Sequence, residues 1–322
     1  MHLFSTLKYV LLLFILGINF HVQTFEEGYA NNNGVEIFYR DYGPVGAEPI
    51  ILVQGLGGQL TFWPENLIDF LIENNFRPIV YDNRDIGLSS KFTGEPNYIS
   101  DYIKYVLRLP LKSEYTIDDM ADDGISILDT LNIDKAHLLG MSMGGMIAQI
   151  MASNHPDRVK SFTLIASTAA TPSPINGPTK EVRDLLMDRS QSKNASYEAR
   201  YKRTVEIISL IGMEGYDFNT PEFKEFSIKN MERSKDDTGF SRQLLAILAS
   251  KNRFEKIRSI QIPTLIVHGE DDPLLKVKNA YKMHSLIPNS ELIIIKNMRH
   301  LIEPPIFKQF DDKLLKHLIT NS

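Results

Sequence analysis

The chain has 322 residues, of which 43% are hydrophobic and 23% charged, and its formal net charge is −5. This balance excludes a wholly disordered or fibrous protein, and the slight acidity, without a basic cluster, argues against nucleic acid as a partner. Because the chain has no cysteine, it has no disulfide, thiol nucleophile or cysteine-ligated zinc.

The first residues differ in character from the rest of the chain. Residues 9–20 form an apolar run that follows Lys8. The run is shorter than the roughly 20 residues that span a membrane, but its length and positive flank are typical of a signal peptide. We therefore expect residues 1–24 to be a signal peptide of an exported protein, either periplasmic or secreted. If the segment stays uncleaved, it would be a membrane anchor, and we expect membrane contact only through this segment. The alternative to a signal peptide is a buried N-terminal helix.

Strand patterns begin after this segment. Asn31-Asn32-Asn33-Gly34 is a turn signal before an alternating strand at 35–42, which together predict an antiparallel hairpin. Residues 49–54 form a continuous apolar run that ends in glycines, as expected for a strand buried on both faces. Residues 62–74 have helical spacing.

Strands and helices then alternate along the chain. Further strands are predicted at 78–81, 136–141, 162–167, 264–268 and 292–295, and further helices at 117–131, 144–153, 278–286 and 306–318. This order predicts an α/β fold with a mostly parallel sheet and helices on both faces.

The alternation stops in one long segment. Residues 169–260 have no convincing buried strand and are helical and charged in pattern, and such a length exceeds an ordinary connection. We expect a helical lid at 169–260, inserted between a first core part at 25–168 and a second at 261–322. Residues 91–115 form a shorter insertion beside it.

A candidate nucleophile lies at the end of a predicted strand. Gly140-Met141-Ser142-Met143-Gly144 matches G-x-S-x-G, with a strand before it and a helix of small and apolar residues after it. A serine in this context sits on a sharp strand-to-helix turn. The free N–H groups at the start of the helix favour a negatively charged oxygen beside that serine.

A serine nucleophile needs a base, and the base needs an orienting carboxylate. His268-Gly269-Glu270-Asp271-Asp272-Pro273 follows one predicted strand and supplies three acids, and His300 follows the next. The carboxyl ends of parallel strands gather at one edge of a sheet, so these segments are expected to meet Ser142. His268, which ends a strand beside the acids, is expected to support the site without acting in it.

These motifs resemble the α/β-hydrolase superfamily. GMSMGGMIAQ is similar to its nucleophile elbow, and HGEDDPL is similar to its acid loop, in which the acid directly precedes proline. The resemblance implies the α/β-hydrolase fold and a catalytic triad of Ser142, Asp272 and His300. The runs LVQGLGG and YDNRDIGLS resemble a bacterial esterase subgroup that includes methylesterase-like members.

By position in this family, the backbone amides of Leu56 and Met143 form the oxyanion hole. Two residues depart from the family pattern: Gln54 stands where the loop usually begins with histidine, and Asp85 stands where many relatives carry glycine. Since the oxyanion donors are backbone amides, Gln54 affects the hydrogen bonding of the loop more than catalysis itself.

The expected function is hydrolysis of a small-molecule carboxylic ester through an acyl-enzyme on Ser142, with no cofactor and no metal. The alternative is cleavage of proline peptides or of C–C bonds by the same triad. A third hypothesis is that the protein binds a ligand without catalysis.

Two charged clusters have simpler explanations than ligand binding. Asp118, Asp119, Asp122 and Asp123 are expected to form an acidic first helical turn rather than a metal site. Arg84 and Asp85 are expected to form an ion pair that holds their loop, with substrate binding as the alternative.

Overall fold

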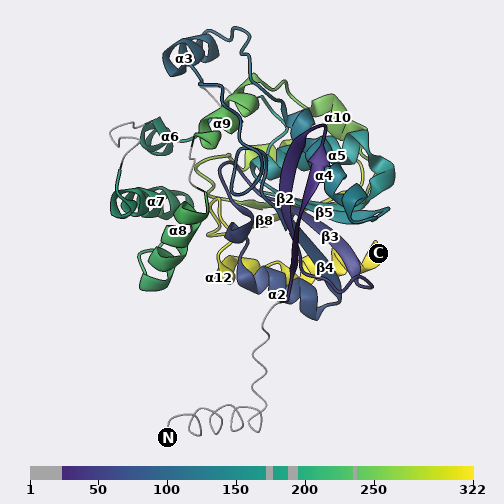
Figure 1. Ribbon diagram of the computed structural model, residues 1–322. Coiled ribbons are helices and arrows are strands. Elements are labelled where there is room, and N and C mark those ends of the chain that lie inside the picture. The colour runs from purple at the N-terminus through teal and green to yellow at the C-terminus, as the bar shows by residue number, and fades with distance from the viewer. Residues whose placement is uncertain (1–23, 172–176, 188–194, 235–237) are drawn as a thin grey trace, which may run out of the picture.

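The computed structural model describes residues 24–171, 177–187, 195–234 and 238–322 (Figure 1). The predicted signal peptide lies almost entirely outside these ranges. Within them, the structure contains no helix that is long and apolar enough to cross a membrane.

Eight strands form one sheet in the order β1-β2-β4-β3-β5-β6-β7-β8. The strands are β1 (Glu26–Asn32), β2 (Val35–Asp41), β3 (Glu48–Val53), β4 (Phe76–Tyr81), β5 (Ala136–Met141), β6 (Val159–Ile165), β7 (Thr264–Gly269) and β8 (Ser290–Ile295). β2 pairs antiparallel with β1 and with β4, and every other neighbouring pair is parallel. The predicted hairpin and mostly parallel sheet are therefore confirmed.

The described helices connect and cover these strands. They are α2 (Glu65–Glu73), α3 (Tyr98–Val106), α4 (Ile117–Thr130), α5 (Met143–Asn154), α6 (Lys180–Met187), α7 (Tyr197–Ile211), α8 (Pro221–Arg233), α9 (Gly239–Ala249), α10 (Phe254–Arg258), α11 (Lys278–His284), α12 (Pro304–Phe307) and α13 (Asp311–Thr320). The helix expected over 62–74 begins only at Glu65, with Pro64 as its N-cap. The reason is that proline disfavours helical backbone in the residue before it.

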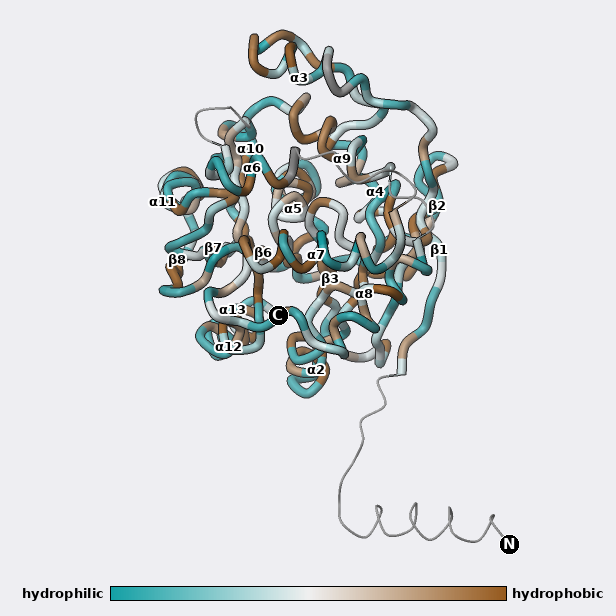
Figure 2. Tube along the Cα trace, turned by 90° about the vertical axis from the view of Figure 1, so that its left-hand side faces the viewer, coloured by the Kyte–Doolittle hydropathy of each residue, from teal (hydrophilic) through white to brown (hydrophobic). Residues whose placement is uncertain are grey.

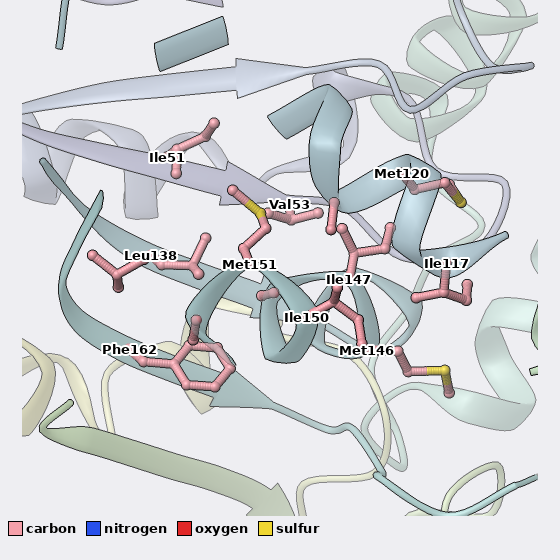
Figure 3. Packing of buried hydrophobic residues seen from close by; sticks show 14 of the residues in the cluster. Ile51, Val53, Ile117, Met120, Leu138, Met146, Ile147, Ile150, Met151 and Phe162 are labelled. Atoms are coloured by element: carbon pink, nitrogen blue, oxygen red, sulfur yellow. The ribbon is translucent and has the colours of Figure 1, made fainter. Parts of the chain in front are cut away.

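The continuous apolar run of β3 serves both faces of the sheet. Ile51 and Val53 join a core cluster with residues of α4, α5, α10 and α11, whereas Ile50 and Leu52 join a second cluster with residues of α2, α12 and α13. Because successive side chains of a strand point to opposite faces, one apolar run supplies both cores. Figure 3 shows the first cluster, in which Ile51, Val53, Leu138 and Phe162 of the sheet face the side chains of α5.

Helices α6 to α10 lie in the chain between β6 and β7, within the segment expected to be a lid. Figure 1 shows α6, α7 and α8 on the left of the sheet. α10 contacts α5, and its Ile257 belongs to the first core cluster. We call residues 169–260 the helical insertion from here on.

The parallel order of β5, β6, β7 and β8 determines where the site can form. Parallel neighbours end at the same edge of a sheet, so the segments after β5, β7 and β8 emerge together. Ser142 follows β5, Asp272 follows β7 and His300 follows β8.

A buried histidine makes the stability of this fold depend on pH. His137 lies in β5, is fully buried, and its Nδ1 lies 2.8 Å from Ser161 Oγ. Burial lowers the pKa of His137 from its ordinary 6.5 to about 3. Between these two values the unfolded chain binds a proton that the folded chain excludes, so the stabilisation is complete above pH 6.5 and is lost as the pH falls.

We expect acidification from pH 7.5 to 4.5 to cost ~2–3 kcal/mol of unfolding free energy through His137, by the linkage between pKa and stability. Urea titrations at both pH values would measure the loss. His137→Gln is expected to reduce this dependence, to which His268 and His317 also contribute because burial lowers their pKa, whereas His284→Gln, at an exposed position, should keep it. An unchanged dependence in His137→Gln would contradict the expectation.

Candidate active site

Ser142 occupies a strained turn between β5 and α5. Its backbone has φ 54° and ψ −119°, a conformation that residues other than glycine rarely adopt. The turn is held because the Ser142 amide donates to Ile165 O at 2.9 Å and the Ser142 carbonyl accepts from Ser167 Oγ at 2.8 Å. Such strain is typical of a nucleophile elbow, which lifts the serine side chain out of the sheet edge.

The glycines around Ser142 permit close approach of neighbouring backbone. A Cβ on Gly144 would lie 1.9 Å from Val53 O, and one on Gly140 would lie 2.5 Å from Gly144 O. A Cβ on Gly55 would lie 3.2 Å from Ser142 Cβ. The G-x-S-x-G pattern therefore has a steric reason, and the loop after β3 passes directly beside Ser142.

The structure brings Ser142, His300 and Asp272 into one row. His300 Nε2 lies 3.0 Å from Ser142 Oγ, and His300 Nδ1 lies 2.8 Å from Asp272 Oδ2. Both partners of Ser142 are buried. Residues that are 130 positions apart, Ser142 and Asp272, thus contact the same imidazole ring from opposite sides.

The Asp272 carboxylate determines which nitrogen of His300 carries the proton. Its Oδ1 accepts the amides of Leu274 and Leu275, both at 2.8 Å, so only Oδ2 faces the ring. An ionised carboxylate only accepts hydrogen bonds, and Nδ1 must therefore be protonated. In neutral His300, Nε2 is then free to accept the hydroxyl proton of Ser142, which is what a general base requires.

His268 lies beside this row but remains outside it. Its Nε2 donates to Leu275 O at 2.6 Å and lies 3.4 Å from Asp272 Oδ2. Burial lowers the pKa of His268, which favours a neutral ring. A neutral His268 leaves the negative charge of Asp272 to His300, and the supporting role of His268 stays a prediction.

Hydrogen bonds within the loop after β3 hold the expected oxyanion donors in position. The side chain of Gln54 accepts the Gly55 amide at 2.7 Å, and the Gly57 amide donates to Gln243 of α9 at 2.9 Å. The Gln54 side chain, which stands where the family usually has histidine, is thus hydrogen-bonded within the loop. Within the described ranges, the Leu56 and Met143 amides donate to no protein acceptor.

The loop after β4 is held differently from expectation. Arg84 and Asp85 do not pair with each other: Arg84 donates to Asp123 at 2.7 Å, and Arg242 of α9 donates to both oxygens of Asp85 at 2.9 Å. Tyr115 also donates to Asp85 at 2.7 Å, and burial, reinforced by that carboxylate, raises the pKa of Tyr115. The predicted Arg84–Asp85 ion pair is therefore wrong, because each side chain has a better-placed partner elsewhere.

The acidic residues at the start of α4 also have defined partners. Thr116 and Asp119 form a reciprocal capping box, and Asp123 is buried against Arg84. The described residues contain no group of three histidine, aspartate or glutamate side chains that could hold a metal ion.

The helical insertion forms hydrogen bonds to the segment around His300, which no sequence pattern had indicated. The His300 amide donates to Ile211 O, at the end of α7, at 2.8 Å. Glu303 is buried and accepts the Met213 amide at 2.7 Å. Burial raises the pKa of Glu303. No local pattern marks Glu303, because its partner lies 90 positions earlier in the chain.

A cavity of about 360 Å³ lies elsewhere, between the segment around α3 and α9. Its lining residues include Asn97, Lys104, Glu114 and Arg242. None of the expected site residues lines this cavity, so its location gives no information about the chemistry at Ser142.

Comparison with known proteins identifies the family of the chain. Residues 48–302 match the family described as the alpha/beta hydrolase fold. The chain is 24% identical over 287 residues to a rhodomycin D methylesterase of Streptomyces peucetius, covering 84% of this chain and 91% of that protein. It is 24% identical over 290 residues to a 3-oxoadipate enol-lactonase of Acinetobacter baylyi, covering 89% of this chain and 96% of that protein.

A solved structure shares the same architecture. A serine hydrolase from the bacterium Cycloclasticus zankles superposes with a TM-score of 0.70 at 18% identity, covering 91% of this chain and 97% of that one. At this identity the likeness concerns the fold. Since the family match spans most of the chain, from β3 to the loop after His300, this protein belongs to the alpha/beta hydrolase fold family.

Proposed function

We propose that this protein is a serine hydrolase that cleaves carboxylic esters of small molecules through an acyl-enzyme on Ser142. The proposal rests on the continuous row of three side chains. His300 Nε2 lies 3.0 Å from Ser142 Oγ, and His300 Nδ1 lies 2.8 Å from Asp272 Oδ2. A binding protein has no physical need for a strained serine joined to a buried base and acid.

In the acylation step, Ser142 Oγ attacks the ester carbonyl carbon while His300 Nε2 takes the hydroxyl proton. The carbonyl oxygen becomes negatively charged, and the amides of Leu56 and Met143 stabilise it. The tetrahedral intermediate then collapses, the C–O bond to the alcohol breaks, and His300 gives its proton to the departing alcohol. Asp272 stabilises the charged imidazole in between.

In the deacylation step, water attacks the acyl-enzyme. His300 Nε2 takes a proton from the water, and the second tetrahedral intermediate releases Ser142, which regains its proton from His300. The products are one carboxylic acid and one alcohol, and neither step needs an added cofactor.

The relatives support an ester as the substrate class. One is named for the hydrolysis of a methyl ester and another for the opening of an enol-lactone, which is a cyclic ester. We propose a small ester or lactone, with the helical insertion as the lid that limits its size.

Labelling with a fluorophosphonate tests the proposal directly, because this reagent forms a stable adduct only with an activated serine. Intact-mass analysis is expected to show one adduct, located on the Ser142 peptide. Release of acid from a panel of methyl esters and lactones would then identify the substrate. A folded protein that takes up no reagent and releases no acid from any ester would overturn the proposal in favour of a binding role.

A further inference from the structure

Exposed apolar side chains are concentrated in one short segment. Tyr102, Ile103, Val106, Leu107 and Leu109 are each between 46% and 62% exposed. The remaining large exposed apolar residues of the described chain are scattered singly over other elements. A local concentration of this kind marks a surface that contacts something apolar.

The backbone of the segment gathers these side chains together. Val106 lies four positions after Tyr102 and three after Ile103 on α3, so it shares a face of the helix with both. The chain then turns through Arg108, which has φ 56°, and the Leu109 amide donates back to Lys104 O at 2.8 Å. The turn keeps Leu107 and Leu109 next to the last turn of the helix. We call residues 102–112 the α3 patch.

The α3 patch lies at one end of the molecule, where Lys104 and Lys112 also line the cavity beside α9. Figures 1 and 2 both show α3 at the end opposite α2, separated from the sheet. Figure 2 shows apolar residues along α3 at this projecting end. A flat apolar surface that approaches from this end would therefore contact α3 before most other parts of the described protein.

The charge of the patch is opposite to that of the protein. Lys104, Arg108 and Lys112 lie within it, and Asp101, one residue before it, pairs with Lys104 at 3.9 Å, whereas the whole chain carries a net charge of −5. In the described chain Arg108 and Lys112 form no ion pair, and both are exposed. Apolar side chains bordered by basic ones are typical of helices that lie in the interface of an anionic membrane.

A second copy of the chain fits this surface less well. Docking two α3 patches would bring the basic residues of both copies together, and like charges repel. A helix of nine residues is also only about 14 Å long, which is short for the ~800 Å² that each partner of a stable dimer buries. Anionic lipid headgroups would instead neutralise Arg108 and Lys112 while the acyl region accepts the apolar side chains.

We propose that the α3 patch binds peripherally to a membrane surface that contains anionic lipid. The side chains of Tyr102, Ile103, Val106, Leu107 and Leu109 enter the headgroup and upper acyl region, and Arg108 and Lys112 contact lipid phosphates or carboxylates. This contact is separate from the N-terminal apolar run and does not depend on the proposed esterase activity.

The absence of cysteine from the chain permits a local test. Leu107→Cys places a single thiol at a well-exposed position of the patch, to which the environment-sensitive dye NBD is attached in the full-length protein. Vesicles of phosphatidylcholine with 30% phosphatidylserine are expected to shift its emission to the blue, and nitroxide-labelled lipid is expected to quench it. A Tyr281→Cys label on α11, 53% exposed, is the matched control and should stay water-like even if the N-terminal run attaches the protein.

Charge reversal tests the role of the basic residues. In the Leu107→Cys protein, Arg108→Glu with Lys112→Glu is expected to raise the lipid concentration at half-maximal shift by about tenfold or more, and 1 M salt should act in the same direction. A label that stays water-like on anionic vesicles would overturn the proposal. So would an equal shift on pure phosphatidylcholine, or a shift that grows with protein concentration without lipid, which would assign the patch to contact between copies.

Discussion

Replacement of Ser142 by alanine is expected to lower kcat for any ester substrate by about 10⁶-fold, on the scale found for serine nucleophiles that act with a histidine and an acid. The reason is that no other hydroxyl takes its place: Ser142 Oγ lies 3.0 Å from His300 Nε2, and the backbone turn is built to present that one oxygen. Steady-state kinetics on the best ester of the panel would measure the loss.

Two controls make this result specific to the nucleophile. The alanine variant should unfold at the same urea concentration as the wild type, since the removed hydroxyl contributes only one partly exposed hydrogen bond. It should also take up no fluorophosphonate. An alanine variant that keeps more than about a hundredth of the wild-type kcat would show that another group forms the acyl-enzyme.

Asp272→Asn is expected to lower kcat by about 10⁴-fold, as loss of the orienting acid does in serine enzymes of this kind. The geometry supplies a reason. Asp272 Oδ1 accepts two backbone amides, so an asparagine here must place its carbonyl oxygen at that position and turn its NH₂ group towards His300 Nδ1. Nδ1 then has to accept, the proton moves to Nε2, and His300 can no longer take the proton of Ser142.

The neighbouring acids provide matched controls for the same charge change. Glu270 and Asp271 are both exposed, whereas Asp272 is buried. Glu270→Gln and Asp271→Asn are therefore expected to change kcat by less than about threefold, in line with the small effects of surface substitutions. A larger loss for Glu270→Gln than for Asp272→Asn would mean that the wrong acid has been assigned.

The helical insertion is connected to the candidate site through several separate contacts. Gln243 accepts the Gly57 amide beside the expected oxyanion donor, Arg242 holds Asp85, and Ile211 O accepts the amide of His300. Movement of α7 or α9 would thus disturb the loop of the base or the loop of the oxyanion donors. This arrangement fits the proposed lid, because closure over a substrate and alignment of the reacting groups involve the same contacts.

Local sequence was sufficient for the parts of this protein that depend on neighbours along the chain. The apolar runs of the strands, their alternation with helices and the Asn-Gly turn predicted the sheet and its hairpin. Ser142 directly follows β5, whereas the three acids and His300 lie in the loops after β7 and β8, and parallel strands end at one edge. The choice of Asp272 among the three acids came from the resemblance to the acid loop of the family. The glycines at 140 and 144 were also visible in the sequence, since the sharp turn around Ser142 imposes them locally.

Tertiary structure alone decided which side chains meet across long stretches of chain. Arg84 pairs with Asp123, 39 positions away, and Asp85 with Arg242, 157 positions away. Adjacency in sequence had suggested a pair between Arg84 and Asp85. Burial of Glu303 against Met213 and exposure of the apolar residues in the α3 patch are likewise properties of packing. Periodicity describes which face of an element is apolar, but the element that covers that face, or leaves it uncovered, is determined by the fold as a whole.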